Sequence, residues 1–334
     1  MDKKGICIAG NMVVDILYPV TGLPRAGELT SIQEGISRST GGAVCNVLGD
    51  LAIMDSGLPL AALGRIGTDA EGDYVLDFLR RHENIDLSMI RREGKTSFTA
   101  VMSDIISKER SFFHYRGANA KFCEDDIDWD KMNCGFLHIG YALLLDALDE
   151  EDSVYGTKMA RLLCHARERG IATSIDVVSE AGDRFKRIVP PSLKYADYCI
   201  INELEAGQVT GFAIRDENGK LIAHNMPKAL EKIKELGVSK WAVIHCPEGG
   251  YGIDNRGKLV ESPAFNLPPD YIKGKVGAGD AFCAGAIYAA SQGGSLEEGL
   301  ELGNEAATAS LSMPGATEGM LPVAELKKLR SRFN

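Results

Sequence analysis

Residues 277–290 read Gly-Ala-Gly-Asp-Ala-Phe-Cys-Ala-Gly-Ala-Ile-Tyr-Ala-Ala. Because Gly277 and Gly279 have no Cβ, the backbone N–H groups of this turn can converge on one point. The small residues that follow contain no proline and predict a helix that begins at the turn. The start of such a helix carries unpaired N–H groups and the positive end of the helix dipole, so it is suited to bind anions.

Asp280 lies in the predicted first turn of this helix, where its carboxylate can accept a proton. The N–H groups of Gly277, Ala278 and Gly279 can stabilise negative charge that develops on a phosphoryl group. We therefore interpret these four residues as the catalytic centre of a phosphoryl transferase. The alternative is a structural turn in which Asp280 only caps the helix.

The longer stretch from Lys275 to Phe282 resembles the C-terminal signature of the ribokinase-like (pfkB-type) carbohydrate kinases. The resemblance implies an α/β fold with a doubly covered, mostly parallel central sheet and a small β-sheet lid, in one domain over residues 1–334. It also implies ATP-dependent phosphorylation of a hydroxyl on a sugar or related small polyol. A nucleoside kinase on the same fold is the alternative, whereas a non-catalytic sugar- or nucleotide-binding regulator is disfavoured because Asp280 is present.

The composition is that of an ordinary globular enzyme, with 45% hydrophobic and 25% charged residues. No apolar run approaches the ~20 residues of a membrane-spanning helix, so we expect no membrane partner. The apolar segment over residues 6–10 is too short for a signal peptide and predicts a first buried strand in a cytoplasmic protein. A formal net charge of -10 disfavours nucleic acid as a partner.

The eight cysteines show no Cys-x-x-Cys spacing, and several lie in apolar, strand-like runs. This pattern favours reduced, buried thiols and disfavours a zinc site or a disulfide framework.

Two segments of the N-terminal half resemble the family's sugar-binding elements. Asp15 follows the first predicted strand, where open α/β sheets place ligand contacts. Gly41 and Gly42 precede a predicted helix that contains Asn46. The resemblance implies that these four residues bind the substrate. A locally satisfied turn aspartate, and glycines that permit close strand–helix packing, are the alternatives.

The predicted lid consists of about residues 13–38 and 95–118, inserted into the α/β core. Residues 22–39 are expected to form short strands, and residues 96–101 and 111–115 a hairpin. Such a lid excludes water from phosphoryl transfer, and the resemblance implies a possible homodimer through it. Arg116 follows the hairpin and is a candidate for binding a carboxylate or phosphate of the substrate. An exposed loop arginine is the alternative.

Beyond residue 154, short apolar runs alternate with predicted helices, as in a largely parallel sheet. The family's Asp-x-Asn-x-Arg element is incomplete, because residues 176–180 read Asp-Val-Val-Ser-Glu. His138 lies inside a predicted strand, which is typical of a structural histidine.

Asn202 and Glu205 match the family's Asn-x-x-Glu motif, which implies a role at the Mg²⁺ ion through its water shell. One carboxylate and one amide suffice, because Mg²⁺ keeps several waters. The same spacing also predicts a capping box at a helix start, and that is the alternative.

Gly249, Gly252 and Asn304 correspond to family positions that border ATP. For the two glycines a tight hairpin is the alternative. Many relatives bind K⁺ through an aspartate before the signature, but here the chain reads Gly274-Lys275-Val276. Lys275 either replaces the ion or points to solvent, so the need for K⁺ stays uncertain.

Overall fold

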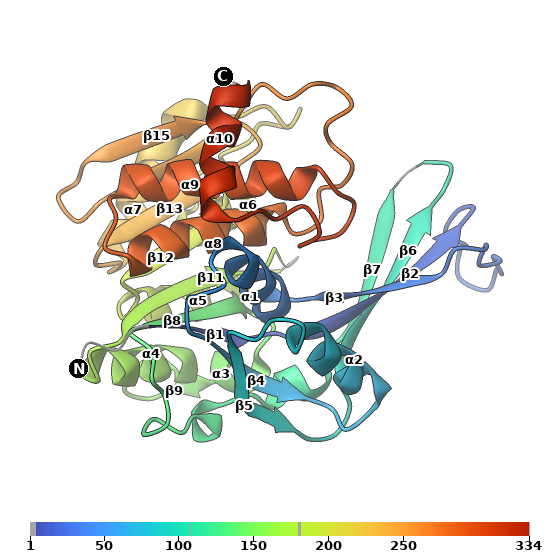
Figure 1. Ribbon diagram of the computed structural model, residues 1–334, viewed down its shortest axis with the longest axis horizontal. Coiled ribbons are helices and arrows are strands. Elements are labelled where there is room, and N and C mark those ends of the chain that lie inside the picture. The colour runs from blue at the N-terminus through green and yellow to red at the C-terminus, as the bar shows by residue number, and fades with distance from the viewer. Residues whose placement is uncertain (1–4, 108, 180–181, 334) are drawn as a thin grey trace.

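The computed structural model describes residues 5–107, 109–179 and 182–333. These residues form a large central sheet with helices on both faces and a separate small sheet that projects from one side (Figure 1). The architecture confirms the predicted α/β fold with a β-sheet lid. Glu180, the last residue of the incomplete Asp-x-Asn-x-Arg element, lies outside the described residues.

The central sheet has nine strands within the described part of the chain. In spatial order they are β15 (Leu259–Pro263), β14 (Gly249–Ile253), β13 (Trp241–Cys246), β12 (Tyr198–Asn202), β11 (Ala172–Val177), β8 (Phe136–Ala142), β1 (Ile6–Gly10), β4 (Leu60–Ile66) and β5 (Ile85–Arg92). Neighbours from β13 to β5 pair in parallel, and β13, β14 and β15 pair antiparallel. The carboxyl ends of the parallel strands therefore meet at one edge, where such sheets bind ligands.

Two helical layers cover the sheet. One layer contains α1 (Ala43–Met54), α2 (Ala70–Leu79), α8 (Ala278–Ser291), α9 (Leu296–Leu311) and α10 (Val323–Phe333). The other contains α3 (Asp146–Asp149), α4 (Lys158–Glu168), α5 (Phe185–Leu193), α6 (Glu203–Thr210) and α7 (Met226–Glu235). Along β1, Ile6 and Ile8 join the first core and Cys7 and Ala9 the second, because successive side chains of a strand point to opposite faces.

The lid is a four-stranded sheet of order β3 (Ser37–Gly41), β2 (Val13–Val20), β6 (Ser97–Asp104) and β7 (Arg110–Tyr115). The predicted hairpin corresponds to β6 and β7, which pair antiparallel. The short strands expected over residues 22–39 are mostly absent among the described residues. That segment has one isolated bridge, Val20 to Ile32, and enters a strand only at Ser37. Its glycines explain the difference, because Gly22, Gly27 and Gly35 have positive φ, which interrupts extended pairing.

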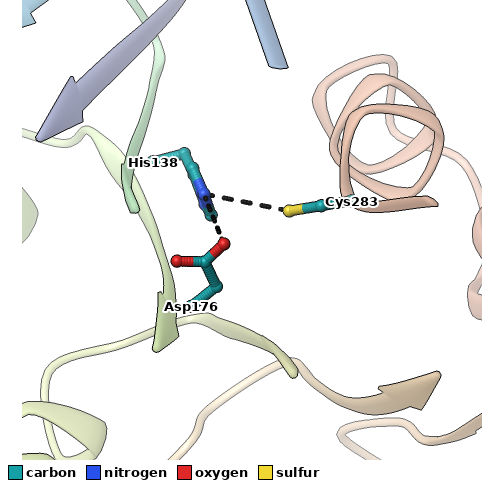
Figure 2. Close-up of side chains that lie close together, drawn as sticks. All are labelled: His138, Asp176 and Cys283. Atoms are coloured by element: carbon teal, nitrogen blue, oxygen red, sulfur yellow. Dashed lines mark hydrogen bonds and ion pairs between the residues drawn. The ribbon is translucent and has the colours of Figure 1, made fainter. Parts of the chain in front are cut away.

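Helix α8 packs against β8 and β11, with Cys283 beside His138 and Asp176 (Figure 2). There Cys283 of α8 lies over His138 of β8 and Asp176 of β11. His138 is fully buried, and its Nδ1 lies 2.9 Å from the Oγ of Ser174. The helix that begins with the signature turn is thus in direct contact with polar groups of the sheet.

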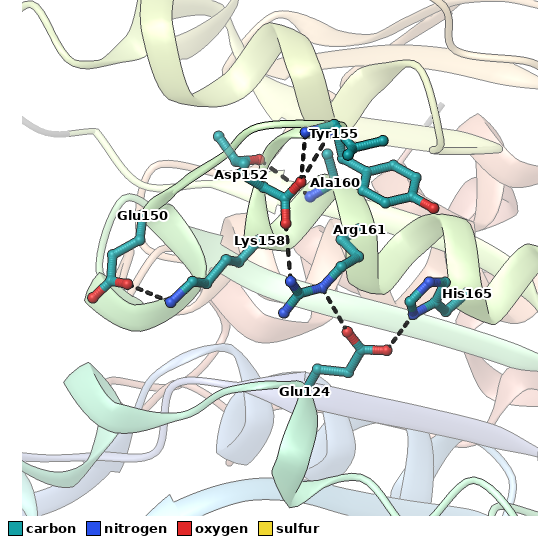
Figure 3. A network of polar contacts seen from close by, with 10 residues as sticks. Glu124, Glu150, Asp152, Tyr155, Lys158, Ala160, Arg161 and His165 are labelled. Carbon is teal, nitrogen blue, oxygen red and sulfur yellow. Dashed lines mark hydrogen bonds and ion pairs between the residues drawn. The ribbon is translucent and has the colours of Figure 1, made fainter.

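On the opposite face, a network of charged groups ties the connection between lid and core to α4 (Figure 3). Glu124 accepts a hydrogen bond from Nε of Arg161 at 3.1 Å and contacts the Nδ1 of His165. Arg161 also donates to Asp152, whose other carboxylate oxygen receives the N–H of Tyr155 at 3.0 Å. This bridging joins segments of the chain that are about 40 residues apart, since Glu124 and His165 differ by 41 positions.

No helix in the described ranges has the length and apolar character needed to cross a bilayer.

Gly285 sets the distance between α8 and α9. A Cβ on this residue would lie 2.5 Å from the carbonyl oxygen of Leu302, which is backbone and cannot rotate away. We expect Gly285→Ala to lower the free energy of unfolding by about 1–3 kcal/mol, the usual cost of overpacking. Gly57→Ala is the control, because a Cβ there meets its nearest neighbour at 3.4 Å. Equal urea midpoints for the two variants would contradict this account of the helix contact.

Candidate active site

The N-terminus of α8 lies where the predicted signature turn placed it. Gly277 is the N-cap residue, with a φ of 76° that favours glycine. A Cβ at this position would also lie 2.6 Å from the Cβ of Ala316. No side chain caps this helix, so its first N–H groups are left for another acceptor.

Asp280 is 7% exposed in the first turn of α8. The Nδ2 of Asn46 donates to its Oδ2 at 2.8 Å, and the hydroxyl of Tyr141 lies 3.0 and 3.1 Å from its two oxygens. Burial, together with the charge of Asp176, raises the pKa of Asp280 to about 6, although the hydrogen bonds from Asn46 and Tyr141 oppose the rise. The carboxylate is thus ionised near neutral pH and basic enough to take a proton.

The structure adds Tyr141 to the residues that the sequence predicted. Tyr141 is the next-to-last residue of β8 and has a φ of 61°, and its N–H donates to Oδ1 of Asp176. Leu143 has a φ of 82°, and its N–H donates to Asp149 at 3.2 Å. Two non-glycine residues with left-handed backbone mark a constrained loop, as is common at functional sites. No sequence motif singled out this tyrosine.

Arg116 supports the same loop. Its Nη1 donates to the carbonyl oxygen of Leu143 at 2.6 Å and lies 3.3 Å from a carboxylate oxygen of Asp146. The predicted arginine is therefore neither an unpartnered surface residue nor a free cation, and its contact with substrate stays a prediction.

Asp15 occupies the middle of a row across the lid. In register it pairs with Thr99 of β6, which pairs with His114 of β7. Oγ1 of Thr99 lies 3.1 Å from Nδ1 of His114, and the Nε2 of that ring is buried without a partner. Burial raises the pKa of Asp15, while the hydrogen bond with Thr99 opposes the shift. His114 was not predicted, because a single histidine in a strand carries no motif.

Gly41 and Gly42 bring the lid and α1 together. A Cβ on Gly41 would overlap the carboxylate of Asp15, and a Cβ on Gly42 would lie 2.5 Å from the carbonyl oxygen of Asn11. Gly42 also has a φ of 83° and is the uncapped N-cap residue of α1. Both glycines thus permit close packing, the alternative that the sequence left open, and the packing places Asp15 next to α1.

A cavity of about 260 Å³ opens beside Asp280 at the carboxyl edge of the sheet. Its lining includes Tyr141, Asp176, Asn202, Glu205 and Cys283. Three of its lining side chains are carboxyls, and no Lys or Arg lines it among the residues that the structure describes. Such a site favours a cation.

Asn202 and Glu205 form the capping box that their spacing allows. The Oδ1 of Asn202 accepts the N–H of Glu205 at 2.9 Å, and Oε2 of Glu205 accepts the N–H of Asn202 at 2.9 Å. The other oxygen of Glu205 accepts from Ser179. Burial, with the charges of Asp176 and Asp280, raises the pKa of Glu205 to about 8. The capping role and the position at the cavity coexist.

A second, more apolar cavity of about 510 Å³ adjoins the first, because His245 and Gly279 line both. Phe265, Leu267 and Phe282 are among its apolar walls, and Asn304 and Lys275 line it as well. Nδ2 of Asn304 donates to Ser262, with its carbonyl oxygen at 2.7 Å. Lys275 is exposed at this cavity, so its cation is available to a ligand there.

His245 separates the two cavities and was also missed by the sequence analysis. Its ring stacks on Phe282 with centroids 5.1 Å apart, and a Cβ on Gly279 would lie 3.0 Å from its Cε1. Burial lowers the pKa of His245 to about 4, so the ring is neutral. Because Gly279 has no side chain, the flat, uncharged ring of His245 can pack against the N-terminus of α8.

Among the described residues that line the two cavities, neither Gly249 nor Gly252 is present. They belong to β14, which forms a hairpin with β13, the alternative noted for them. A Cβ on Gly249 would overlap the backbone of Ser262, and one on Gly252 would lie 2.8 Å from Leu296. The glycines accommodate β15 and α9. A further cavity of about 600 Å³, between α8, α9 and α10, is lined by residues other than Asp280 and its partners.

Comparison with known families agrees with this geometry. The family described as pfkB family carbohydrate kinase matches residues 3–324. The chain is 25% identical over 331 residues to an ATP-dependent ribose-1-phosphate kinase of Halopiger xanaduensis, with 98% of each chain covered. It is also 25% identical over 268 residues to an uncharacterized sugar kinase of Archaeoglobus fulgidus, covering 79% of this chain and 96% of that one.

Solved structures share the fold. The ribokinase of Thermotoga maritima superposes with a TM-score of 0.79 at 20% identity, covering 98% of this chain and 99% of that one. Arabidopsis thaliana ribokinase, solved with ribose and ATP, gives a TM-score of 0.79 at 21% identity, with 98% of each chain covered. With the signature turn, the buried Asp280 and a family match over nearly the whole length, the chain belongs to the pfkB family of carbohydrate kinases, phosphotransferases with an alcohol group as acceptor.

Proposed function

We propose that this enzyme transfers the γ-phosphoryl group of ATP to a hydroxyl of a sugar or related small polyol, with Asp280 as the general base. The observation that carries the proposal is the position of Asp280, buried at the uncapped start of α8 in the wall of the polar cavity, which adjoins the apolar one. The apolar cavity suits a nucleotide base, and the polar one suits phosphates and their counter-ion.

The proposed reaction needs only positioning, a proton acceptor and charge stabilisation. Asp280 takes the proton of the acceptor hydroxyl while the hydroxyl oxygen forms a bond to the γ-phosphorus. The bond between that phosphorus and the β–γ bridging oxygen breaks, and ADP leaves. N–H groups of Gly277, Ala278 and Gly279 stabilise the negative charge on the transferring group. The ring of His245 is neutral, so it adds no charge to the cavity that we assign to the phosphates.

Unpaired polar groups support binding of the acceptor between Asp280 and the lid. Oδ1 of Asn46 and Nε2 of His114 are buried without hydrogen-bond partners. Buried polar atoms are rarely left unpaired, so both suit a ligand that brings hydroxyl groups. Asp15, beside Gly41 and in the same row as His114, supplies a further acceptor. Arg116 acts there through the loop that carries Tyr141, or directly on an anionic acceptor.

For the nucleotide, we assign the adenine to the apolar cavity, with Asn304 at its wall and Lys275 near the phosphates. Glu205 and Asn202 would act on Mg²⁺ through its water shell, in a cavity that has carboxyls and no described Lys or Arg. The donor set fits the ion. When bound with ATP, Mg²⁺ neutralises phosphate charge. A role for Gly249 and Gly252 would be indirect, through the sheet.

Asp280→Asn keeps the shape of the side chain and removes the proton acceptor. We expect it to fold normally and to lose roughly 10²–10⁴-fold in kcat. The assay is ATP consumption with ribose, ribose 1-phosphate, hexoses, sugar acids and nucleosides. Asp77→Asn, an exposed change on α2, is the control. Near-wild-type turnover by folded Asp280→Asn would refute the general-base assignment, and turnover confined to nucleosides would favour the alternative acceptor class.

The pKa of Asp280 sets the acidic limb of the pH profile. Since the base must be ionised, kcat/KM should fall as the pH drops through about 6. The phenol of Tyr141 lowers this pKa by hydrogen bonding, so Tyr141→Phe should shift the limb to higher pH. Tyr288→Phe is the matched control, because Tyr288 lies on α8, as Asp280 does, but its hydroxyl donates to Asp55 at 3.0 Å. Superimposable limbs for the wild type and Tyr141→Phe would contradict the contact's role.

We also propose that the lid mediates a homodimer. Large apolar side chains are exposed on it, including Leu29 at 90%, Ile106 at 72%, Phe112 at 65% and Phe113 at 58%. Phe112 and Phe113 are successive residues of a strand, so apolar surface lies on both faces of the lid. Exposed apolar patches of this kind mark association sites, and a second copy of the lid matches them in character.

Phe112→Glu places a charge on that surface and should convert the dimer to a monomer, as measured by light scattering after size-exclusion chromatography at micromolar concentrations. Val154→Glu is the control, because Val154 is 78% exposed in a segment outside the lid. A monomeric wild-type protein, or a dimer that tolerates Phe112→Glu, would argue against association through this surface.

A further inference from the structure

Three potential metal ligands from three separate elements converge beneath the proposed phosphate cavity. Nε2 of His138 on β8 lies 3.8 Å from Oδ2 of Asp176 on β11 and 3.8 Å from Sγ of Cys283 on α8 (Figure 2). All three ligand atoms lie within 4.8 Å of one another. A nitrogen–oxygen separation of 3.8 Å is too long for a hydrogen bond, so no direct hydrogen bond holds Asp176 to His138. The sulfur of Cys283 lies within hydrogen-bond distance of the same Nε2.

The separations suit a shared ion. Zinc binds nitrogen and oxygen at about 2.0–2.2 Å and sulfur at about 2.3 Å in tetrahedral geometry. Adjacent ligands of such a tetrahedron are therefore roughly 3.3–3.7 Å apart. The observed 3.8 Å distances need only a small contraction to reach this range.

Each of two ligands is oriented by an outer contact. Nδ1 of His138 lies 2.9 Å from Oγ of Ser174, which leaves Nε2 facing Asp176 and Cys283. Oδ1 of Asp176 accepts the N–H of Tyr141, which leaves Oδ2 on the side of the histidine. Contacts of this kind fix the ring and carboxylate of metal ligands.

The surroundings favour a cation and leave room for a fourth ligand. His138, Cys283 and Asp176 are 0%, 2% and 7% exposed, and the last two line the 260 Å³ cavity. Asp280 and Glu205 line the same cavity, with no Lys or Arg among its described residues. Three protein ligands with one open position are typical of zinc sites that hold a water or substrate.

We propose that His138, Asp176 and Cys283 form a binding site for a thiophilic divalent metal ion such as Zn²⁺ in the wall of the active-site cavity. Imidazole and thiolate ligands select such ions over Mg²⁺ and Ca²⁺, which prefer oxygen. Cys283 binds as the thiolate and releases its proton to solvent. With one carboxylate, one thiolate and a neutral imidazole, a divalent ion leaves the cluster neutral. The site is separate from the oxygen donors assigned to Mg²⁺ and is independent of the acceptor's identity.

Cobalt(II) provides a direct probe, because its bond to a thiolate produces an intense near-ultraviolet charge-transfer absorption. The full-length protein, stripped with chelator and kept reduced, is titrated with Co²⁺ and then with Zn²⁺. We expect one equivalent of Co²⁺ to produce the band and Zn²⁺ to abolish it. Absence of the band in the folded wild type would overturn the proposal.

Cys283→Ser should abolish the band and weaken calorimetrically measured Zn²⁺ binding by at least tenfold. Cys199→Ser, at an equally buried thiol on β12, should retain both, and so should Cys164→Ser on the surface of α4. A band that survives Cys283→Ser, or that is lost in either control, would place the metal elsewhere and refute the site.

If Cys283→Ser does not fold, Ser174→Ala tests the same site from outside the ligand set. Loss of the hydroxyl that orients His138 should weaken Zn²⁺ binding about 10–100-fold. Unchanged affinity in this variant would contradict the proposed ligand geometry.

Discussion

Helix α8 begins at Gly277, whose positive φ and lack of space for a Cβ beside Ala316 both require glycine, and the position of that helix start determines the rest of the site. In helices α2, α4, α6 and α9, the side chain of the N-cap residue accepts a hydrogen bond from an N–H group of the first turn. These N-cap residues are Asp69, Thr157, Asn202 and Ser295. In contrast, α1 and α8 start at Gly42 and Gly277, whose positive φ values suit glycine and whose lack of a side chain leaves the helix ends uncapped. The two open helix starts meet at the bond between Asn46 and Asp280. Helices α3, α5 and α7 also lack a capping side chain, so the start of α8 is distinguished by its position beside Asp280 and the polar cavity.

A shortage of positive charge is the complementary constraint. Asp176, Glu205 and Asp280 share a small cavity, and burial shifts the pKa of Glu205 and of Asp280 upward. Like charges in a site of low polarity are costly unless a cation or a proton compensates them. The raised pKa values of these two carboxyls show that bound protons meet part of this demand. Under the proposed function, Mg²⁺ and Lys275 at the neighbouring cavity would supply the remaining positive charge.

Outside residues 22–39, the sequence was sufficient for the α/β character of the core and for the helix that begins at Gly277, because periodicity and glycine-rich motifs indicate local structure. Asn46, Asn202 and Glu205 could be predicted as site residues for the same reason, because each lies at the start of a helix. Tyr141 and His245 were missed because each is a single residue at a strand end, and only the sheet order brings them to Asp280.

Two expectations depended on features that sequence cannot resolve. A glycine indicates that another group lies close but not which group. Gly249 and Gly252 pack closely against β15 and α9, and their predicted contact with ATP stays a prediction. Cysteine spacing likewise predicts only metal sites built from one segment. Cys283 lies close to His138 and Asp176, although these residues are 145 and 107 positions away in the sequence. No local sequence pattern predicts such a contact.

The left-handed backbone of Tyr141 has a consequence for how this enzyme can be altered. Non-glycine residues in this conformation cost about 1–3 kcal/mol each, and Leu143 adds a second instance two residues later. Glycine at position 141 would relieve the strain but remove the hydroxyl that holds Asp280. Selection for heat resistance and selection for turnover therefore act in opposite directions on this loop. Attempts to stabilise the protein are best directed at the surfaces of the helical layers, where no such conflict exists.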